Sequence, residues 1–239
     1  MGRPFLTAQW RKLILVNYEV QPSVLHSYLP IGTELDLWNN KCYVSLVGFM
    51  FLDTKVKGCK LPGHVNFEEV NLRFYVKHTT LDGTQRRGVV FVREIVPKPI
   101  ITTIANKVYK EHYQTLPMQH DWFHTVDELK VKYSWFTGNR EHLIAVETEN
   151  KPFSIVTGSE EEFITEHYWG YTKIDAKRTS EYEVKHPSWK VYKVKKANIG
   201  VDFQLTYGND FEFLNDLKPS SVMLAEGSDI SVGNKRIIK

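Results

Sequence analysis

The sequence predicts a mainly β protein of the α+β class, in which an antiparallel sheet curls or closes on itself and a few helices lie at its edges. Three observations support this prediction. Apolar and polar residues alternate with a period of two in several segments, turn residues separate these segments at short intervals, and helical spacing is confined to short stretches. Because hairpins rather than helical crossovers join the strands, they should pair antiparallel.

The first part of the chain predicts short elements around one long apolar strand. The predicted elements are, in order, a strand over 13–18, a helical turn over 22–28 and a hairpin of strands over 34–38 and 41–53. Asn39-Asn40 should form the hairpin turn, since asparagine tolerates left-handed backbone. Gly48 in the apolar arm indicates a bulge or a kink, and an exposed loop is predicted over 57–64.

The stretch over 66–120 is the most informative part of the sequence, and it predicts strand, turn, strand, helix and strand. Apolar and polar residues alternate over 70–77, and Asp82-Gly83 marks a hairpin turn because glycine accepts a positive φ. A second strand runs over 87–96 and is apolar on both faces at its centre, so both of its faces should be covered.

The period changes after this second strand, where apolar residues recur at helical spacing from Ile100 to Tyr109. We therefore predict a helix of about three turns that packs on the sheet. In that arrangement Val89 and Ile104 should both be buried. Extended chain is expected to return over 113–118.

The remaining part of the chain predicts further strands and one short helix. The predicted strands lie over 127–136, 141–149, 182–185, 188–196, 200–207 and 222–225. Ser159 and Glu162 form a capping box, because their side chains can each satisfy a free N–H group at a helix start. A short helix over 160–167 should follow.

Length and composition predict one globular domain over residues 1–239. Hydrophobic residues make up 42% of the chain and aromatic residues 13%, which is enough to bury a core without cross-links. No linker or low-complexity segment divides the sequence. The 31 basic and 28 acidic residues nearly balance, which argues against a nucleic-acid or membrane surface.

The same features predict a cytoplasmic protein without membrane partners. Cys42 and Cys59 are too few for a disulfide framework. No apolar run reaches the roughly 18 to 20 residues of a membrane-spanning helix, and the start of the chain has no apolar signal core. The oligomeric state is left open by the sequence, a homo-oligomer included.

Charged residues interrupt the apolar pattern of the two central strands, and they are the first candidates for a site: Glu68, Glu69, Arg73, Arg93 and Glu94. Glu68 shares the apolar face of its strand, whereas Glu69 shares the other face with Arg73. A carboxylate on an apolar face has a raised pKa unless it is paired, which favours Glu68 as an acid–base group. A structural Glu–Arg pair inside the sheet fits the same residues.

Two weaker patterns point to other functions. His120 and His124, with His112 nearby, have a spacing that a metal site can use, but no third ligand is clearly placed, and we predict no metal and no cofactor. The lysines and aromatic residues of Lys185–Lys196 resemble a strip that stacks nucleic-acid bases. Lysines on an edge strand also block aggregation, and the net charge of +3 is low, so we predict no nucleic-acid partner.

Several segments together resemble the YqjF-like family of uncharacterised bacterial proteins, and this resemblance covers nearly the whole chain. The segments are Arg11 with LILVNYEV, the stretch that ends at Leu29-Pro30, NFEEVNL, GVVFVREI and TLPMQH. Over about residues 11–120 the chain also resembles the acetoacetate decarboxylase-like superfamily. That resemblance implies a curled sheet in a cone-like β-barrel. It also implies a site in which a Schiff-base lysine lies beside an arginine and two glutamates.

Carried over residue by residue, the resemblance places the arginine at Arg11 and one glutamate at Glu69. The lysines fall on Met118 and Gln119, and neither side chain can form an imine. The second glutamate falls near 45–47, where the sequence has no carboxylate. The resemblance therefore implies a pocket without Schiff-base chemistry. It selects Glu69 where the face argument selects Glu68, so both are kept.

We predict that the protein binds or acts on a small carboxylate or carbonyl compound. The expected catalytic residues are Glu69 and Arg11, and the expected ligand contacts are Glu68, Arg73, Arg93, Glu94, Met118 and Gln119. If the protein is an enzyme, it is a lyase, hydrolase or isomerase that uses a glutamate as acid and base. The alternatives are a sensor or scaffold without turnover and a nucleic-acid-binding protein that uses Lys185–Lys196.

Overall fold

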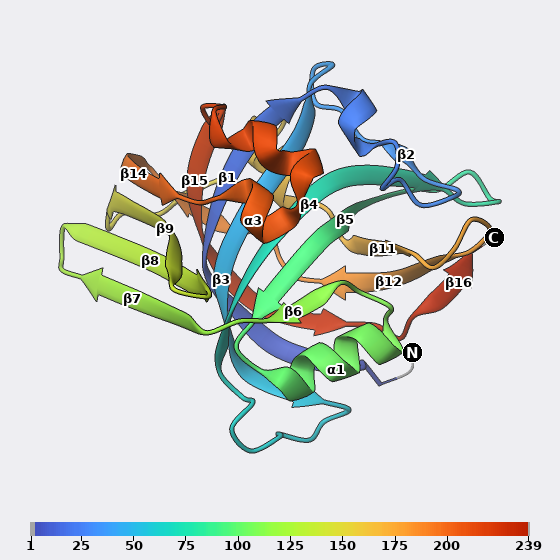
Figure 1. Cartoon of the computed structure of the whole chain (residues 1–239), viewed down its shortest axis with the longest axis horizontal. Helices are drawn as coiled ribbons and strands as arrows, with labels where there is room; N and C mark the ends of the chain where they lie inside the picture. The colour runs from blue at the N-terminus through green and yellow to red at the C-terminus, as the bar shows by residue number, and fades with distance from the viewer. Residues whose placement is uncertain (1–2, 239) are drawn as a thin grey trace.

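The computed structural model describes residues 3–238 as a curled twelve-stranded sheet with a separate four-stranded sheet beside it (Figure 1). The strands are β1 (Leu6–Val20), β2 (Glu34–Leu35), β3 (Cys42–Val56), β4 (Phe67–Thr79), β5 (Gln85–Val96), β6 (Tyr113–Thr115), β7 (Met118–His124), β8 (Glu128–Thr137), β9 (Arg140–Glu149), β10 (Phe153–Ser154), β11 (Trp169–Lys173), β12 (Thr179–Lys185), β13 (Lys190–Tyr192), β14 (Val194–Gly200), β15 (Ser221–Val232) and β16 (Arg236–Ile238). The helices are α1 (Pro99–Val108), α2 (Glu160–Thr165) and α3 (Phe203–Tyr207), with 3₁₀ helices η1 (Pro22–Leu25) and η2 (Asn209–Asn215). The predicted class, mainly β with a curled sheet, is confirmed.

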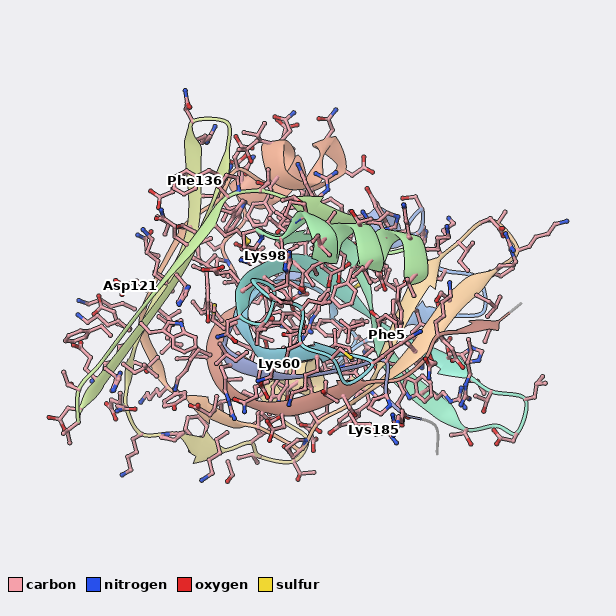
Figure 2. All side chains as sticks on the ribbon, turned by 90° about the horizontal axis from the view of Figure 1, so that it is seen from below. Phe5, Lys60, Lys98, Asp121, Phe136 and Lys185 are labelled. Atoms are coloured by element: carbon pink, nitrogen blue, oxygen red, sulfur yellow. The ribbon has the colours of Figure 1, made fainter. Side chains whose placement is uncertain are left out.

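The large sheet closes into a ring. Its strands follow the order β15, β1, β3, β4, β5, β11, β12, and β12 pairs back onto β15 through Val184–Val232 and Lys185–Ser231. Neighbours pair antiparallel except at β5, which pairs parallel with β6 and β11. Figure 2 shows these strands curling around a centre that is filled with side chains. The ring therefore gives every strand an inner and an outer face.

The outer face packs against the four-stranded sheet β14-β9-β8-β7. Alternate residues of β4, among them Val70 and Leu72, join Tyr133 and Ile144 in one apolar core. Gly48 makes this contact possible, because a Cβ atom there would lie 2.6 Å from Cδ1 of Ile144. The bulge predicted at Gly48 lies in the neighbouring strand instead: Gly48 pairs regularly with Val70, and the register shift falls in β1 between Arg11 and Ile14.

The inner face carries a second apolar core, which α2 closes at one end with Phe163 and Ile164. The predicted capping box starts this helix: the backbone N–H of Glu162 donates to Oγ of Ser159 at 3.2 Å. The returning bond reaches one residue further back, where the N–H of Gly158 donates to the Glu162 carboxylate at 2.7 Å. A short local sequence thus determines where α2, the helix at one end of the inner core, begins.

The other predicted elements are confirmed in part. The strand–turn–strand–helix–strand order of 66–120 is correct, and Val89 is buried, whereas Ile104 on α1 is only partly buried. The predicted strand over 200–207 is wrong, because Asp202 caps the short helix α3 there. The strand β11 was missed. No helix within residues 3–238 is long and apolar enough to cross a membrane.

Candidate functional site

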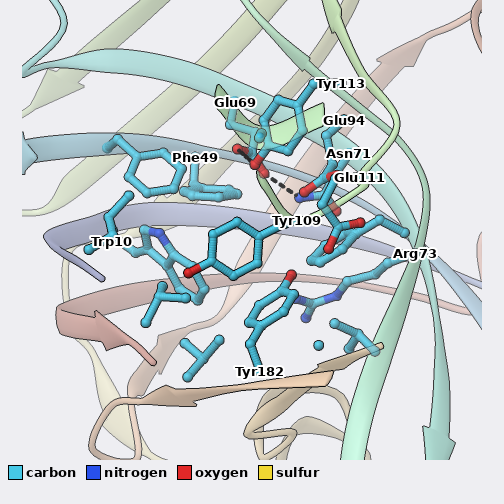
Figure 3. A pocket seen from close by; sticks show the side chains of 18 of the residues that line it. Trp10, Phe49, Glu69, Asn71, Arg73, Glu94, Tyr109, Glu111, Tyr113 and Tyr182 are labelled. Atoms are coloured by element: carbon cyan, nitrogen blue, oxygen red, sulfur yellow. Dashed lines mark hydrogen bonds between the residues drawn. The ribbon is translucent and has the colours of Figure 1, made fainter. Parts of the chain in front are cut away.

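A cavity of about 120 Å³ lies inside the ring, between α1 and the strands β4, β5 and β12 (Figure 3). Its wall is rich in aromatic side chains, which include Trp10, Phe49, Tyr109, Tyr113 and Tyr182. The polar side chains in the wall include Glu69, Asn71, Arg73, Glu94, Glu111 and His167. The site is therefore an apolar pocket with a small set of charged groups, the common form of a small-molecule site.

The polar face of β4 supplies half of these groups. Glu69, Asn71 and Arg73 stand at two-residue spacing, so the pleat points all three into the ring. Glu94 joins them from β5, where it pairs with Asn71. The chain after α1 then returns as β6, parallel to β5, and the pairing of Tyr113 with Glu94 brings Tyr113 into the cavity.

Three buried carboxyl groups meet at this end of the cavity, on Glu69, Glu94 and Glu111. Their residues are 2%, 2% and 6% exposed. Glu69 accepts hydrogen bonds from Nδ2 of Asn71 and from the hydroxyl of Tyr113, both at 2.9 Å. Glu111 accepts one from Oγ1 of Thr172 at 2.7 Å. Within residues 3–238, Oε2 of Glu94 and Oε2 of Glu111 have no hydrogen-bond partner.

Burial makes these carboxyl groups weaker acids than an exposed glutamate. It raises the pKa of Glu69 to about 7 and the pKa of Glu111 to about 7, against the hydrogen bonds that each group accepts. The pKa of Glu94 is raised well above its ordinary value, first by burial and then by the neighbouring charges of Glu111 and Glu69. The cluster therefore keeps protons at neutral pH that an exposed glutamate would lose.

The cavity wall also carries Arg73 and His167, and the charge of Arg73 opposes the burial that raises the pKa of Glu69. One Arg73 nitrogen, Nη2, donates to the carbonyl of Ile164 at 3.3 Å, while its Nε has no partner among the described residues. Nε2 of His167 lies 3.1 Å from Oδ2 of Asp36, which also accepts from Nε of Arg87 at 2.6 Å. Burial lowers the pKa of His167 to about 4, so the ring is neutral at pH 7. Its Nδ1 has no partner in the described part of the chain.

Three of the predicted site residues line the cavity: Glu69, Arg73 and Glu94. Glu68 points to the opposite face of β4, where its carboxylate lies 2.6 Å from Nδ1 of His120. The apolar face of this strand is thus the outer one, and the argument that placed Glu68 in the pocket was wrong. Arg93 also points outward and donates to the carbonyl of Thr206, because a bulge in β5 places it opposite Leu72.

Arg11 was expected beside Glu69, but it lies outside the cavity wall. A β-bulge separates its pairing from that of Ile14, and Lys12 within the bulge has a φ of 54°. The guanidinium group of Arg11 donates to Oε1 of Gln9 and to the carbonyl of Gly227. The cation in the cavity is Arg73 instead.

Met118 and Gln119 also lie away from the cavity. They begin β7 and pair with Trp135 and Ser134 of β8, so Met118 packs against the outer core and Gln119 is exposed. The segment after α1 that enters the cavity is the one with Glu111 and Tyr113, which precede Met118 by seven and five residues. Neither was predicted, since no periodicity marks this short stretch.

The lysine strip over Lys185–Lys196 does not present its aromatic rings to solvent. Trp189 and Tyr192 are 4% and 5% exposed, and Nε1 of Trp189 donates to Oγ of Ser228 at 2.9 Å. Because base stacking needs an accessible ring face, these two rings are not placed to stack on bases.

Known structures share this fold. MppR, an enduracididine biosynthesis enzyme complexed with the condensation product of pyruvate and imidazole 4-carboxaldehyde, gives a TM-score of 0.71 at 13% identity, over 99% of this chain and 90% of that one. Acetoacetate decarboxylase from Legionella pneumophila gives 0.67 at 11% identity, over 100% and 88%. At such identities the likeness establishes an acetoacetate decarboxylase-like fold and leaves the reaction open.

Sequence comparison points to one family. The uncharacterised protein YqjF of Bacillus subtilis is 27% identical over 99 residues, which cover 38% of this chain and 41% of that protein. The match thus spans less than half of YqjF. Residues 7–229 match the family model DUF2071, described as an uncharacterised conserved protein. Since this match spans most of its length, the chain belongs to the DUF2071 family.

Proposed function

We propose that the protein binds a small carbonyl or carboxylate compound in the cavity inside the ring. The observation that carries this proposal is the set of buried polar atoms without partners there, on Asn71, Arg73, Glu94 and Glu111, counted over residues 3–238. Each unpaired buried group costs about 1–3 kcal/mol of folding free energy. A ligand that pairs with these groups offsets that cost.

The size of the cavity limits the ligand. Its volume of about 120 Å³ is somewhat below the roughly 150 Å³ of an engineered cavity that takes up benzene. A compound with about six non-hydrogen atoms therefore fits. The structural relative MppR forms a complex with pyruvate, a compound of this size.

The charged groups of the cavity suggest how such a compound would be bound and how a proton could be transferred to or from it. Arg73 offers a donor fork for a carboxylate or a polarised carbonyl, the role that the sequence had given to Arg11. Glu69, with its pKa near 7, can take up and return a proton at neutral pH. These two roles fit a lyase, hydrolase or isomerase with acid–base chemistry. Binding without turnover would make the protein a sensor or carrier with the same site.

A thermal-shift screen tests the proposal. Short keto acids, aldehydes and small carboxylates should raise the Tm, and product analysis of the hits separates an enzyme from a sensor. Glu69→Gln should reduce the ligand-induced shift more than it changes the ligand-free Tm. Glu68→Gln is the matched control, one residue away on the outer face. The proposal fails if no compound raises the Tm, or if both variants reduce the shift equally.

A further inference from the structure

One end of the cavity is unbalanced in hydrogen-bonding capacity. The acid end is formed by Glu69, Asn71, Glu94, Glu111 and Tyr113. Among its donors, Nδ2 of Asn71 and the Tyr113 hydroxyl both bond to Glu69, and the Tyr182 hydroxyl lies near Glu111. Three acceptor atoms in the described residues stay unpaired there: Oδ1 of Asn71, Oε2 of Glu94 and Oε2 of Glu111. When its carboxyl groups are ionised, the acid end therefore has a surplus of acceptors over donors.

The three unpaired acceptors belong to one neighbourhood. Asn71 and Glu94 are paired across β4 and β5, and the charge of Glu111 acts on Glu94. Figure 3 shows their side chains gathered at one end of the cavity. The Tyr182 hydroxyl near Glu111 lowers the pKa of that carboxyl but leaves its Oε2 unpaired among the described residues. The residues themselves are 1%, 2% and 6% exposed.

We propose that this acid end binds a primary ammonium group, so that the ligand is a small amino acid-like zwitterion with its carboxylate on Arg73. An ammonium group has three N–H donors and no acceptor, which matches three unpaired acceptors. This inference rests on the proposed function and narrows its ligand. The aromatic wall suits the same group, since ring faces attract cations.

The chemistry of the cluster disfavours the two simpler alternatives. A keto acid brings only acceptor oxygens, so it can pair with Arg73 or with a carboxyl group that keeps its proton, but it gives Oδ1 of Asn71 no donor. A neutral alcohol supplies donors, but it does nothing to balance three buried carboxyl groups against one guanidinium. A cation does both, because its charge favours the ionised carboxylate over the protonated acid.

This difference in charge gives the proposal a signature other than activity. An ammonium group lowers the pKa of the carboxyl groups that it contacts, so binding near pH 7 should release protons. A keto acid adds negative charge to the cavity, so its binding should take up protons. Isothermal titration calorimetry in two buffers of different ionisation enthalpy measures the number and sign of the exchanged protons.

The experiment compares 2-aminobutanoate, 2-oxobutanoate and propylamine on the wild-type chain. We expect 2-aminobutanoate to bind at least about tenfold more tightly than each of the others, a difference of roughly 1.4 kcal/mol, with proton release. Equal or tighter binding of 2-oxobutanoate, or proton uptake with 2-aminobutanoate, overturns the inference and leaves the proposed function standing. If none of the three binds, and the wider screen finds no ligand either, both are overturned.

Variants locate the effect at the acid end. Glu111→Gln replaces an unpaired acceptor by a donor, so the preference for 2-aminobutanoate over 2-oxobutanoate should fall to within about twofold. Glu94→Gln is the second test of the same kind, should the first variant fold poorly. The preference is a ratio of two affinities on one variant, so it does not depend on the folded fraction. Glu68→Gln, on the outer face, should retain the full preference. A full preference in both cavity variants contradicts the assignment.

Discussion

The two faces of β4 bury their side chains to a similar degree, but they differ in what those side chains contact. On the outer face Val70, Leu72 and Phe74 are fully buried in the core between the two sheets. On the inner face Asn71 and Arg73 are 1% and 8% exposed, yet both keep a polar atom without a partner in the described residues. Burial alone therefore does not distinguish the two faces of β4, whereas the unpaired polar atoms on this strand, all of them on its inner face, do.

The comparison also suggests how stability is distributed. The outer face is packed with apolar groups, and Gly48 shows how close that packing is. The inner face holds three carboxyl groups that would be more stable in water. Proteins keep such groups where binding or catalysis needs them. Changes on the outer face should therefore destabilise the fold, while neutralising changes on the inner face should not.

The largest effect is expected on the outer face. Leu72→Ala should lower the free energy of unfolding by about 2–5 kcal/mol, because it removes buried methyl groups and leaves a cavity between the sheets. Urea unfolding followed by circular dichroism measures this loss. The ligand-induced Tm shift should stay close to that of the wild type. A loss below about 1 kcal/mol would show that this face is less tightly packed than described.

A smaller effect, of opposite sign, is expected on the inner face. The pKa of Glu111 is raised to about 7 in the folded chain, so the folded state holds a proton that the unfolded state loses above about pH 4.5. Its contribution to stability therefore falls as the pH rises from about 4.5 to 7. Glu111→Gln removes this term, so the variant should be more stable than the wild type by roughly 1–3 kcal/mol at pH 8.

The measurement must compare variant and wild type, because His167 acts in the opposite direction. Its pKa is lowered to about 4, so its contribution to stability is lost as the pH falls from about 6.5 to 4. Urea unfolding of both proteins at pH 5 and pH 8 isolates the Glu111 contribution as a difference of differences. A variant that is less stable at pH 8, or a stability difference that does not change with pH, would contradict the prediction.

The next smaller effect is expected at α2, the helix that covers one end of the inner core. Ser159→Ala removes the hydroxyl that accepts from the N–H of Glu162, which should lower the free energy of unfolding by about 1 kcal/mol. Ser159→Gly should cost only a few tenths of a kcal/mol, since glycine is also tolerated as an N-cap. Ligand affinity should weaken with the alanine variant, because α2 holds Arg73 through Ile164. Equal stability of both variants would mean that the cap does not hold this helix.

For the last test, borohydride trapping of a lysine imine, we expect no effect. Treatment with borohydride in the presence of pyruvate or acetoacetate should give no covalent adduct detectable by intact-mass spectrometry. The described residues that line the cavity include no lysine, and Lys12 points outward to Tyr192 and Glu226. An adduct that maps to a lysine would show that an amine reaches the ligand. It would contradict the expectation that the cavity works without Schiff-base chemistry.

The sequence predicts the two faces of β4 but not which one lies inside the ring. Alternation separates Glu68 from Glu69, and the apolar face was taken as the interior, although a second sheet covers it. Arg11 was misplaced because a bulge at Lys12 leaves no local pattern. Glu111 was missed because only the parallel pairing of β6 with β5, a long-range feature, brings its segment to the cavity.

The short helix α3 shows the same limit on a smaller scale. Its segment was predicted as a strand, because Val201, Phe203 and Leu205 alternate with polar residues. The buried residues are in fact Phe203, Thr206 and Tyr207, at helical spacing, and the capping Asp202 was the signal that distinguishes the two. Over five residues, period alone does not decide between a strand and a helix.

The place of β1 in the ring has a consequence for synthesis on the ribosome. This early strand forms hydrogen bonds on one side with β3, close in the chain, and on the other with β15, where Arg11 contacts Gly227, 216 residues away. Until β15 has left the exit tunnel, one edge of β1 is open to wrong partners, as edge strands are. Such long-range pairing also slows folding. The chain should therefore complete its ring, and with it the cavity wall at Val232, only after β15 has left the exit tunnel.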